Sequence, residues 1–467
     1  MGDDNEAGTS RAVAAWTFGL SLVSVVAVGV VVAGFLHSPE PELTTALPTT
    51  TPPTTEPERP EYSYITPSVT YPTQIPGCDV VERPGESEWT AFVVDRDSGY
   101  DNPDYPWFSG PKAGAMSRAL RDALPGGVEV EFASPERSLI FQPIMSEDAP
   151  EDGAPDYDGN TNADATLSRD GKNGSLSVAV RLSTDAIPAC VAGYLDARRT
   201  LADGTVVDVL DTWSETNGVR TLSRSASAYA PDGTRVSAYA TDAAVADSGQ
   251  ANSGTVPLTV DELVVLVTAP GLRVTAPVPP GSATPPASCS SPVEQRSGPD
   301  IDRATAERFG TMLAAVPLDG LTLDRPLGAL QPARLGGDAV CQSVRVTTPG
   351  RESTLDVAIA GGQELPSTDA PPEASSERSR TTVRQLPDGS VVEQSEHDYT
   401  SMGLHPGSET RATTQRVVTV TRPSGTLVRA SSEADSPSVP VSFEQLDAIA
   451  LVPGIPGSRC PGEARDP

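Results

Sequence analysis

An internal duplication is the sequence feature that most constrains how this chain can fold. The same short motifs occur twice and in the same order, starting at Cys78 in the first copy and at Cys289 in the second. Ser175–Val180 (SLSVAV) is matched by Thr354–Ile359 (TLDVAI), and a Phe-Gln-Pro or Leu-Gln-Pro tripeptide precedes each of these segments. Motifs repeated in a fixed order indicate a duplicated structural unit. We therefore expect two copies of one fold.

Each copy predicts the order helix, antiparallel strands, helix. The first helices are expected over residues 115–125 and 305–317, where apolar residues recur at helical spacing. Capping boxes at Thr259–Glu262 and Ser442–Gln445 begin the closing helices. Hairpins are indicated by turn dipeptides whose glycine supplies a positive φ: Asp203-Gly204, Asp232-Gly233, Asp388-Gly389 and Ser424-Gly425. The predicted fold class is α+β, with an antiparallel sheet and flanking helices in each copy.

The run Ala12–Leu36 contains no charged residue. At about 1.5 Å per residue it is long enough to cross a hydrocarbon core of about 30 Å. It is also longer than the apolar region of a cleavable signal peptide, so we expect a retained transmembrane helix. Arg11 precedes the run and no basic residue follows it until Arg59. The positive-inside rule therefore places the N-terminal tail in the cytoplasm and the remainder of the chain outside.

The segment that follows the anchor is rich in Pro, Thr and Glu. Such a composition cannot bury a core and favours an extended tether. The expected organisation is a cytoplasmic tail (1–11), a transmembrane helix (12–36), an extracellular Pro/Thr-rich linker (38–77), a first α+β copy that we call module 1 (78–276), a Pro-rich hinge (277–288) and a second copy that we call module 2 (289–460).

The formal net charge of the 467 residues is −30. Nucleic-acid binding needs a basic surface that replaces phosphate counterions, so no nucleic-acid partner is expected. Lys112 and Lys172 are the only lysines, and arginine supplies almost all the other positive charge. This usage is typical of a GC-rich, actinobacterial kind of genome.

Five cysteines leave one residue over after pairing. An oxidising exterior permits disulfides, and we expect Cys78–Cys190 and Cys289–Cys341. Cys460 would then be free or paired between chains. Cys341–Cys460 is the alternative within module 2.

Catalytic signatures are weak, and no catalytic, cofactor-binding or metal residue is assigned. His397 lies in a predicted strand, where its neighbours Glu396 and Asp398 would point to the opposite face. The S-x-x-K match Ser109–Lys112 contains Gly110-Pro111, which we expect to break the helical turn that such a pair requires. The modules share almost no acidic position outside turns and caps. We therefore expect a protein that is not an enzyme.

Two stretches found only in module 1 are the remaining candidates for a site. Residues 156–164 place oxygen side chains at alternate positions, as in a calcium loop, but Thr161 and Leu167 replace its glycine and glutamate. We expect no strong calcium site there. Residues 98–110 carry four aromatic residues beside carboxylates, a composition that suits a glycan- or partner-binding face. We favour the alternative in which Trp107 and Phe108 plug the edge of the core.

These features favour a single-pass protein of the cell membrane that displays two tandem, non-catalytic binding modules outside the cell. The expected partner is another envelope protein or a cell-wall glycan. One alternative is a structural or accessory subunit of a membrane complex, whose anchor helix makes the contacts. Another is a divergent cell-wall hydrolase.

Overall fold

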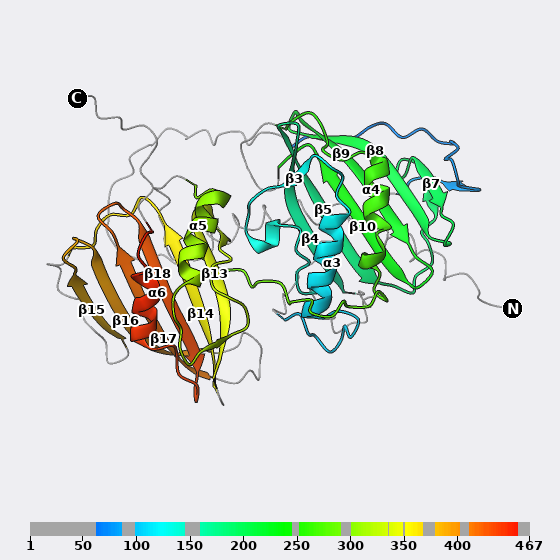
Figure 1. Cartoon of the computed structure of the whole chain (residues 1–467). Helices are drawn as coiled ribbons and strands as arrows, with labels where there is room; N and C mark the ends of the chain where they lie inside the picture. The colour runs from blue at the N-terminus through cyan, green and yellow to red at the C-terminus, as the bar shows by residue number, and fades with distance from the viewer. Residues whose placement is uncertain are drawn as a thin grey trace, which may run out of the picture.

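The computed structural model describes residues 62–85, 99–144, 159–244, 252–290, 300–334, 336–348, 351–367, 379–401 and 411–455. Two antiparallel sheets of eight strands each carry the fold, and a short parallel pair lies apart from them. The sheets belong to separate modules, each with two helices lying across one face (Figure 1). The predicted pair of sheet modules with flanking helices is therefore confirmed within these residues.

The sheet of module 1 has the order β1-β8-β9-β10-β5-β4-β3, with β7 also paired to β8. The strands are β1 (Tyr64–Ile65), β3 (Val128–Val130), β4 (Asn160–Arg169), β5 (Lys172–Leu182), β7 (Ala197–Thr200), β8 (Val206–Thr216), β9 (Val219–Tyr229) and β10 (Thr234–Thr241). The helices are α3 (Gly110–Asp122) and α4 (Val260–Val267), with the short 3-10 turns η3 (Pro135–Arg137) and η4 (Pro270–Leu272). The parallel pair is β2 (Val81–Glu82) with β6 (Cys190–Val191).

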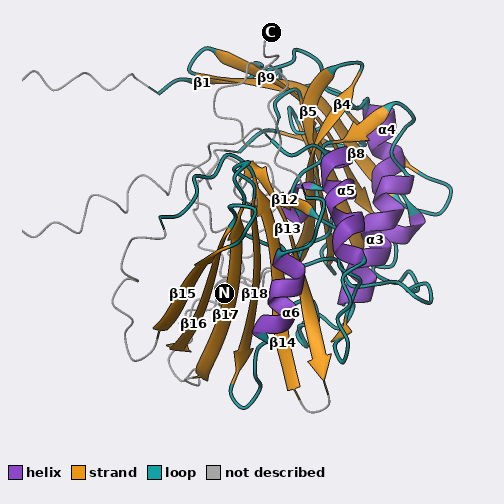
Figure 2. Cartoon of the chain, turned by 60° about the vertical axis from the view of Figure 1, so that its left-hand side comes forward, coloured by secondary structure: helices purple, strands orange, loops and turns teal. Residues whose placement is uncertain are grey.

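The sheet of module 2 has the order β11-β13-β14-β18-β17-β16-β15, with β12 also paired to β13. Its strands are β11 (Thr322–Leu323), β12 (Gln331–Ala333), β13 (Gly336–Thr348), β14 (Arg351–Ala360), β15 (Ser379–Gln385), β16 (Val391–Ser401), β17 (Arg411–Thr421) and β18 (Leu427–Asp435). The helices are α5 (Arg303–Ala314) and α6 (Phe443–Ala450), and α6 lies across the sheet over β17 and β18 (Figure 2).

The two sheets have the same topology. Reading from β3 and from β11, the orders β4-β5-β10-β9-β8 and β13-β14-β18-β17-β16 correspond strand for strand, and β7 takes the edge position of β15. This order places sequence-distant strands side by side in the same way twice. It supports the duplication read from the motifs.

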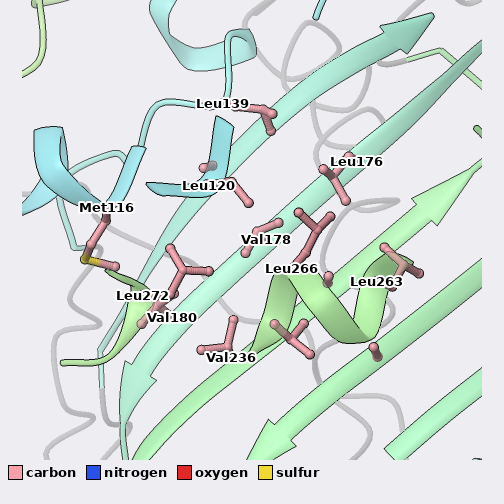
Figure 3. Packing of buried hydrophobic residues seen from close by; sticks show 14 of the residues in the cluster. Met116, Leu120, Leu139, Leu176, Val178, Val180, Val236, Leu263, Leu266 and Leu272 are labelled. Atoms are coloured by element: carbon pink, nitrogen blue, oxygen red, sulfur yellow. The ribbon is translucent and has the colours of Figure 1, made fainter. Parts of the chain in front are cut away.

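The core of module 1 lies between the sheet and its helices. Met116 and Leu120 of α3 and Leu263 and Leu266 of α4 point toward the valines and leucine of β5 (Figure 3). The first pair is spaced by four residues and the second by three, so each pair forms one apolar helix face. In module 2, Phe309 and Leu313 of α5 and Leu446 and Ile449 of α6 pack on the sheet in the corresponding way.

The predicted helix caps, turns and disulfides are confirmed in the described residues. Both capping boxes are formed, with Thr259 and Ser442 each accepting a hydrogen bond from the backbone of the residue three positions later. The Asp-Gly turns before β8 and β16 have the same geometry, with Gly204 at φ 81° and Gly389 at φ 83°. Both expected disulfides, Cys78–Cys190 and Cys289–Cys341, are present. Cys460 lies outside the described residues.

Part of the predicted linker and the predicted hinge pack on module 1. Residues 64–65 form β1 on the edge of β8, and the carbonyl of Pro76 accepts a hydrogen bond from Arg198. Ala283 and Thr284 of the hinge lie directly against α3 at Gly114 and Gly110, where a Cβ atom would collide with them. These Pro-rich segments therefore contribute packing to the module.

The predicted transmembrane helix at 12–36 and the tail before it lie outside the described residues. Among the residues that are described, none of the helices has the length and apolar character needed to cross a bilayer.

Candidate functional site

Each sheet has one face covered by helices and a second face that we call the open face. On module 2 the core takes Val392, Val418 and Val428, so the residues that alternate with them belong to the open face. The open face combines hydroxyl, amide and charged side chains on four neighbouring strands, β15 to β18. It is therefore polar where the opposite face is apolar.

A hollow of about 240 Å³ lies on this open face. Its lining side chains come from all four strands: Thr381, Glu393, Ser395, His397, Gln415, Val417, Thr419 and Arg429. Val417 is 6% exposed and forms an apolar patch among the polar groups. The volume is about eight times the roughly 30 Å³ that one water occupies in the liquid, so the hollow is small but larger than a water site.

Glu393 and Arg429 bring opposite charges to the hollow. Both side chains are half-buried. Burial alone raises the pKa of Glu393, and burial lowers the pKa of Arg429, with the nearby Asp356 acting against that fall. Over the described parts of the chain, neither side chain forms a salt bridge or a side-chain hydrogen bond. Glu393 is thus partly desolvated without a charged partner, whereas Arg429 has the carboxylate of Asp356 near it.

Module 1 has a carboxylate at the position equivalent to Glu393, and there it is paired with an arginine. The hairpin motifs align Asp208 of β8 with Glu393 of β16, because each follows its Asp-Gly turn by four residues after the glycine. Asp208 lies directly opposite Arg198 and accepts two hydrogen bonds of 2.7 Å from its guanidinium. Glu393 lies directly opposite Val383, which is 39% exposed. Module 2 therefore lacks the cation that neutralises this position in module 1.

The remaining cation of the hollow is specific to module 2. The second hairpins align Arg429 of β18 with Ser237 of β10, and Thr419 of β17 with Ser227 of β9. The module 1 face at these positions is a row of hydroxyl groups without an arginine. Among the described residues, the combination of a carboxylate facing no cation and an arginine in the same row therefore occurs in module 2 and not at the aligned positions of module 1.

His397 has a partner that sequence reasoning missed. Its Nδ1 lies 2.9 Å from Oγ of Ser379, which is directly opposite on β15. As predicted, its sequence neighbours face the other way: Glu396 accepts a hydrogen bond from Arg416, and Asp398 accepts one from Thr414. The histidine therefore has a hydroxyl partner but no adjacent carboxylate from its own strand.

Asp356 is the carboxylate beside Arg429. It lies opposite Ser343 on the neighbouring strand, and burial raises its pKa. Module 1 has the same carboxylate–hydroxyl combination with the strands exchanged, since Asp164 of β4 lies opposite Ser177 of β5. Each module thus has one acid in this pair of strands, on β14 in module 2 and on β4 in module 1.

The prediction that Gly110-Pro111 would break a helix is wrong. Helix α3 begins at Gly110, with Ser109 as its N-cap and Pro111 in the first turn, where a missing N–H leaves no bond unmade. Lys112 is 3% exposed and its ammonium donates to the carbonyls of Arg273, at 2.8 Å, and Ala276. Burial lowers its pKa. This lysine therefore holds the C-terminal segment of module 1 against α3. Its ammonium is directed to those carbonyls and not to the Ser109 hydroxyl.

The two insertions of module 1 also differ in part from expectation. Residues 156–158 lie outside the described part, but Asn160 to Asp164 belong to β4 and form a core strand, so they are not a loop. Within the described residues, no group of three or more His, Cys, Asp or Glu side chains is placed to hold a metal ion. In the other insertion, Phe108 is 3% exposed and Trp107 packs on the same core. The aromatic stretch therefore plugs the core edge, as favoured.

The modules do share an acidic position outside their turns and caps, as part of an aligned ion pair. On the helix-covered side, Arg224 bonds Asp211 at 2.9 Å in module 1, and Arg416 bonds Glu396 at 2.7 Å at the aligned position in module 2. Both arginines also donate to a carbonyl just before the cap of the closing helix, that of Leu258 or of Val441. The motif was hidden because one pair uses aspartate and the other glutamate. Its contacts mark it as a scaffold feature.

The chain matches no known protein-family model, and it shows no significant similarity to a curated protein or to a solved structure.

Proposed function

We propose that this protein is a membrane-anchored envelope protein that displays its two modules outside the cell, and that module 2 binds a ligand in the hollow without chemically changing it. The anchor is Ala12–Leu36, and the two disulfides support an oxidising location for the modules. The observation that supports the binding function is a hollow lined by two half-buried charges, Glu393 without a charged partner and Arg429 beside Asp356. Module 1 serves as a scaffold in this proposal, because its equivalent carboxylate is already neutralised.

A cell-wall fragment or an envelope protein segment is the expected source of the ligand. The test uses the full-length protein, purified in detergent and incubated with soluble fragments of digested cell wall. Thr419→Trp fills the hollow while keeping both charges, and Ser227→Trp makes the same change at the aligned position of module 1. The wild type and Ser227→Trp should retain a fragment that Thr419→Trp loses. Equal retention by both variants, or no retention by the wild type, would contradict the proposal.

One observation favours a hydrolase as the second candidate. Ser379 and His397 are within hydrogen-bond distance, as a nucleophile and its base must be. However, acyl transfer also needs donors aimed at the developing oxyanion, and the backbone N–H groups of a paired strand are used in its ladder. Mass spectrometry of the recovered fragments separates the two functions. Unchanged masses support binding, whereas smaller products that disappear in Ser379→Ala would establish hydrolysis.

A further inference from the structure

The two charges of the hollow lie in one row across the sheet. Glu393 is directly opposite Thr419, and Thr419 is directly opposite Arg429. Two strand spacings of about 4.8 Å separate the Cα atoms of the charged residues by about 10 Å. Side chains on one face of a sheet stand roughly perpendicular to it, and with both side chains upright the charged heads would have a similar separation. This separation agrees with the absence of a salt bridge between these two described residues.

The carboxylate of Glu393 is unfavourably placed while the hollow is empty. A partly buried charge loses hydration, and the loss is compensated when a partner of opposite sign approaches. Module 1 compensates Asp208 internally through Arg198, whereas Glu393 faces Val383. A bound group with a positive end at Glu393 and a negative end at Arg429 would supply the partner that Glu393 lacks and add a second one to Arg429 beside Asp356.

We propose that the hollow binds a small zwitterion, an amino acid or a dipeptide, with its ammonium at Glu393 and its carboxylate at Arg429. The inference rests on the proposed ligand-binding function and adds the chemical class of the ligand. Thr419 lies between the two charges, where its hydroxyl can bond the middle of the ligand. Val417 offers an apolar contact for a small side chain such as a methyl group.

The size of a small zwitterion suits the gap. About 2.5 Å separates the ammonium nitrogen of an amino acid from its carboxyl carbon, and each further residue adds about 3.5 Å. With charge-assisted hydrogen bonds of about 2.8 Å at both ends, an amino acid spans about 9 Å and a dipeptide about 13 Å between the protein heads. The separation of about 10 Å lies between these values. A longer peptide would have to leave the hollow at one end.

The first test is titration calorimetry of the full-length protein with alanine, alanyl-alanine, N-acetyl-alanyl-alanine and alanyl-alanine amide. Each blocked probe lacks one charge and should bind the wild type about tenfold or more weakly than the free dipeptide. In Glu393→Gln, N-acetylation should lose this effect, and in Arg429→Gln, amidation should lose it. This pairing assigns each end of the ligand to one residue. Comparing alanine with alanyl-alanine distinguishes the two sizes.

A second test restores the module 1 arrangement in module 2. Val383→Arg places a guanidinium opposite Glu393, as Arg198 is opposite Asp208, and should abolish dipeptide binding without unfolding the sheet. Thr382→Arg is the matched control, since it adds the same charge to the opposite face of the same strand at an exposed position. The control should bind as the wild type does.

The outcomes separate this inference from the function on which it rests. If Thr419→Trp loses a wall fragment but the blocked probes bind as well as the free dipeptide, the ligand is not a zwitterion and the binding function stands. If Val383→Arg and Thr382→Arg weaken dipeptide binding equally, the ammonium site is not at Glu393. If the wild type binds neither wall fragments nor any dipeptide, both proposals are overturned.

Discussion

At the scale of single residues, Glu393 and Asp208 occupy one duplicated position but have different electrostatic surroundings. Their equivalence was readable in the sequence, because TVVD and SVVE follow matching Asp-Gly turns. The difference lies in the residue across the hairpin, arginine in one copy and valine in the other. Counting outward from the turn on both strands would have found it. The position of Arg429 in the same hollow could not be found in this way, because it depends on which strands become neighbours in the sheet.

The burial of Glu393 gives a pH-dependent stability. Its raised pKa means that the folded state holds the proton more tightly than the unfolded chain. Stability from this group is present below the unfolded pKa and is lost as pH rises through the folded pKa. Glu393→Gln should therefore unfold at a higher temperature than the wild type near neutral pH. The two proteins should converge below about pH 4, where the glutamate is protonated.

The groups that face Glu393 are Arg429 and His397 of the same hollow. Calorimetric unfolding at several pH values measures the difference. Glu396→Gln is the contrasting variant, because that carboxylate is paired with Arg416 and its loss should destabilise the protein at neutral pH. A destabilised Glu393→Gln protein near neutral pH would mean that the carboxylate has a favourable partner.

At the scale of secondary-structure elements, local sequence signals predicted most of the helix ends and turns. Capping boxes, Asp-Gly turns and helix stops act within a few residues, so they could be read without the fold. The start of α3 also has a local explanation. Proline breaks the interior of a helix but fits its first turn, which is where Pro111 lies. Strand β4 was missed because Asn160–Asp164 is as polar as a loop on one side of its alternation.

The shared arginine pair should anchor the closing helix of each module. Arg416 joins strand β17 to Glu396 and to the chain just before α6. Arg416→Met should destabilise module 2 by about 1–3 kcal/mol, because it leaves a half-buried carboxylate and carbonyls without their donor. Arg224→Met should have the equivalent effect on module 1.

Arg384→Met provides the control for this prediction. Arg384 also contacts α6, through Asp447, but its side chain is 46% exposed. The loss of an exposed ion pair should change stability by less than about 1 kcal/mol. Denaturant unfolding measures all three variants. Equal effects of Arg416→Met and Arg384→Met would argue against an anchoring role.

At the scale of the whole molecule, the modules contact each other through η3 and the residues just before it. Phe132 of module 1 packs against the core of module 2, and the guanidinium of Arg303 lies 5.0 Å from its ring centroid. Arg334 of module 2 lies 3.6 Å from Glu136. These contacts join distant parts of the sequence, so motif matching within each copy could not predict them.

Phe132→Ala should loosen this contact. It removes an aromatic ring from the module 2 core and the cation–π partner of Arg303. Amide hydrogen exchange over residues 303–314 should become faster, while exchange in β4 and β5 stays unchanged. Tyr62→Ala, at a side chain that is 68% exposed, should leave both regions as they are. Unchanged exchange in α5 of the Phe132→Ala protein would indicate that the contact does not couple the modules.

The way the chain enters module 1 has a mechanical consequence. With the proposed anchor at the amino end, any tension between membrane and wall reaches the module first at β1, which holds β8 through two residue pairs. That attachment can peel open under a small force and release slack. The pull then arrives at Cys78, whose covalent link to Cys190 passes the load to the connection between β5 and β7. The entry segment would therefore extend by the length of chain between β1 and Cys78 before any load reaches the strands of the sheet.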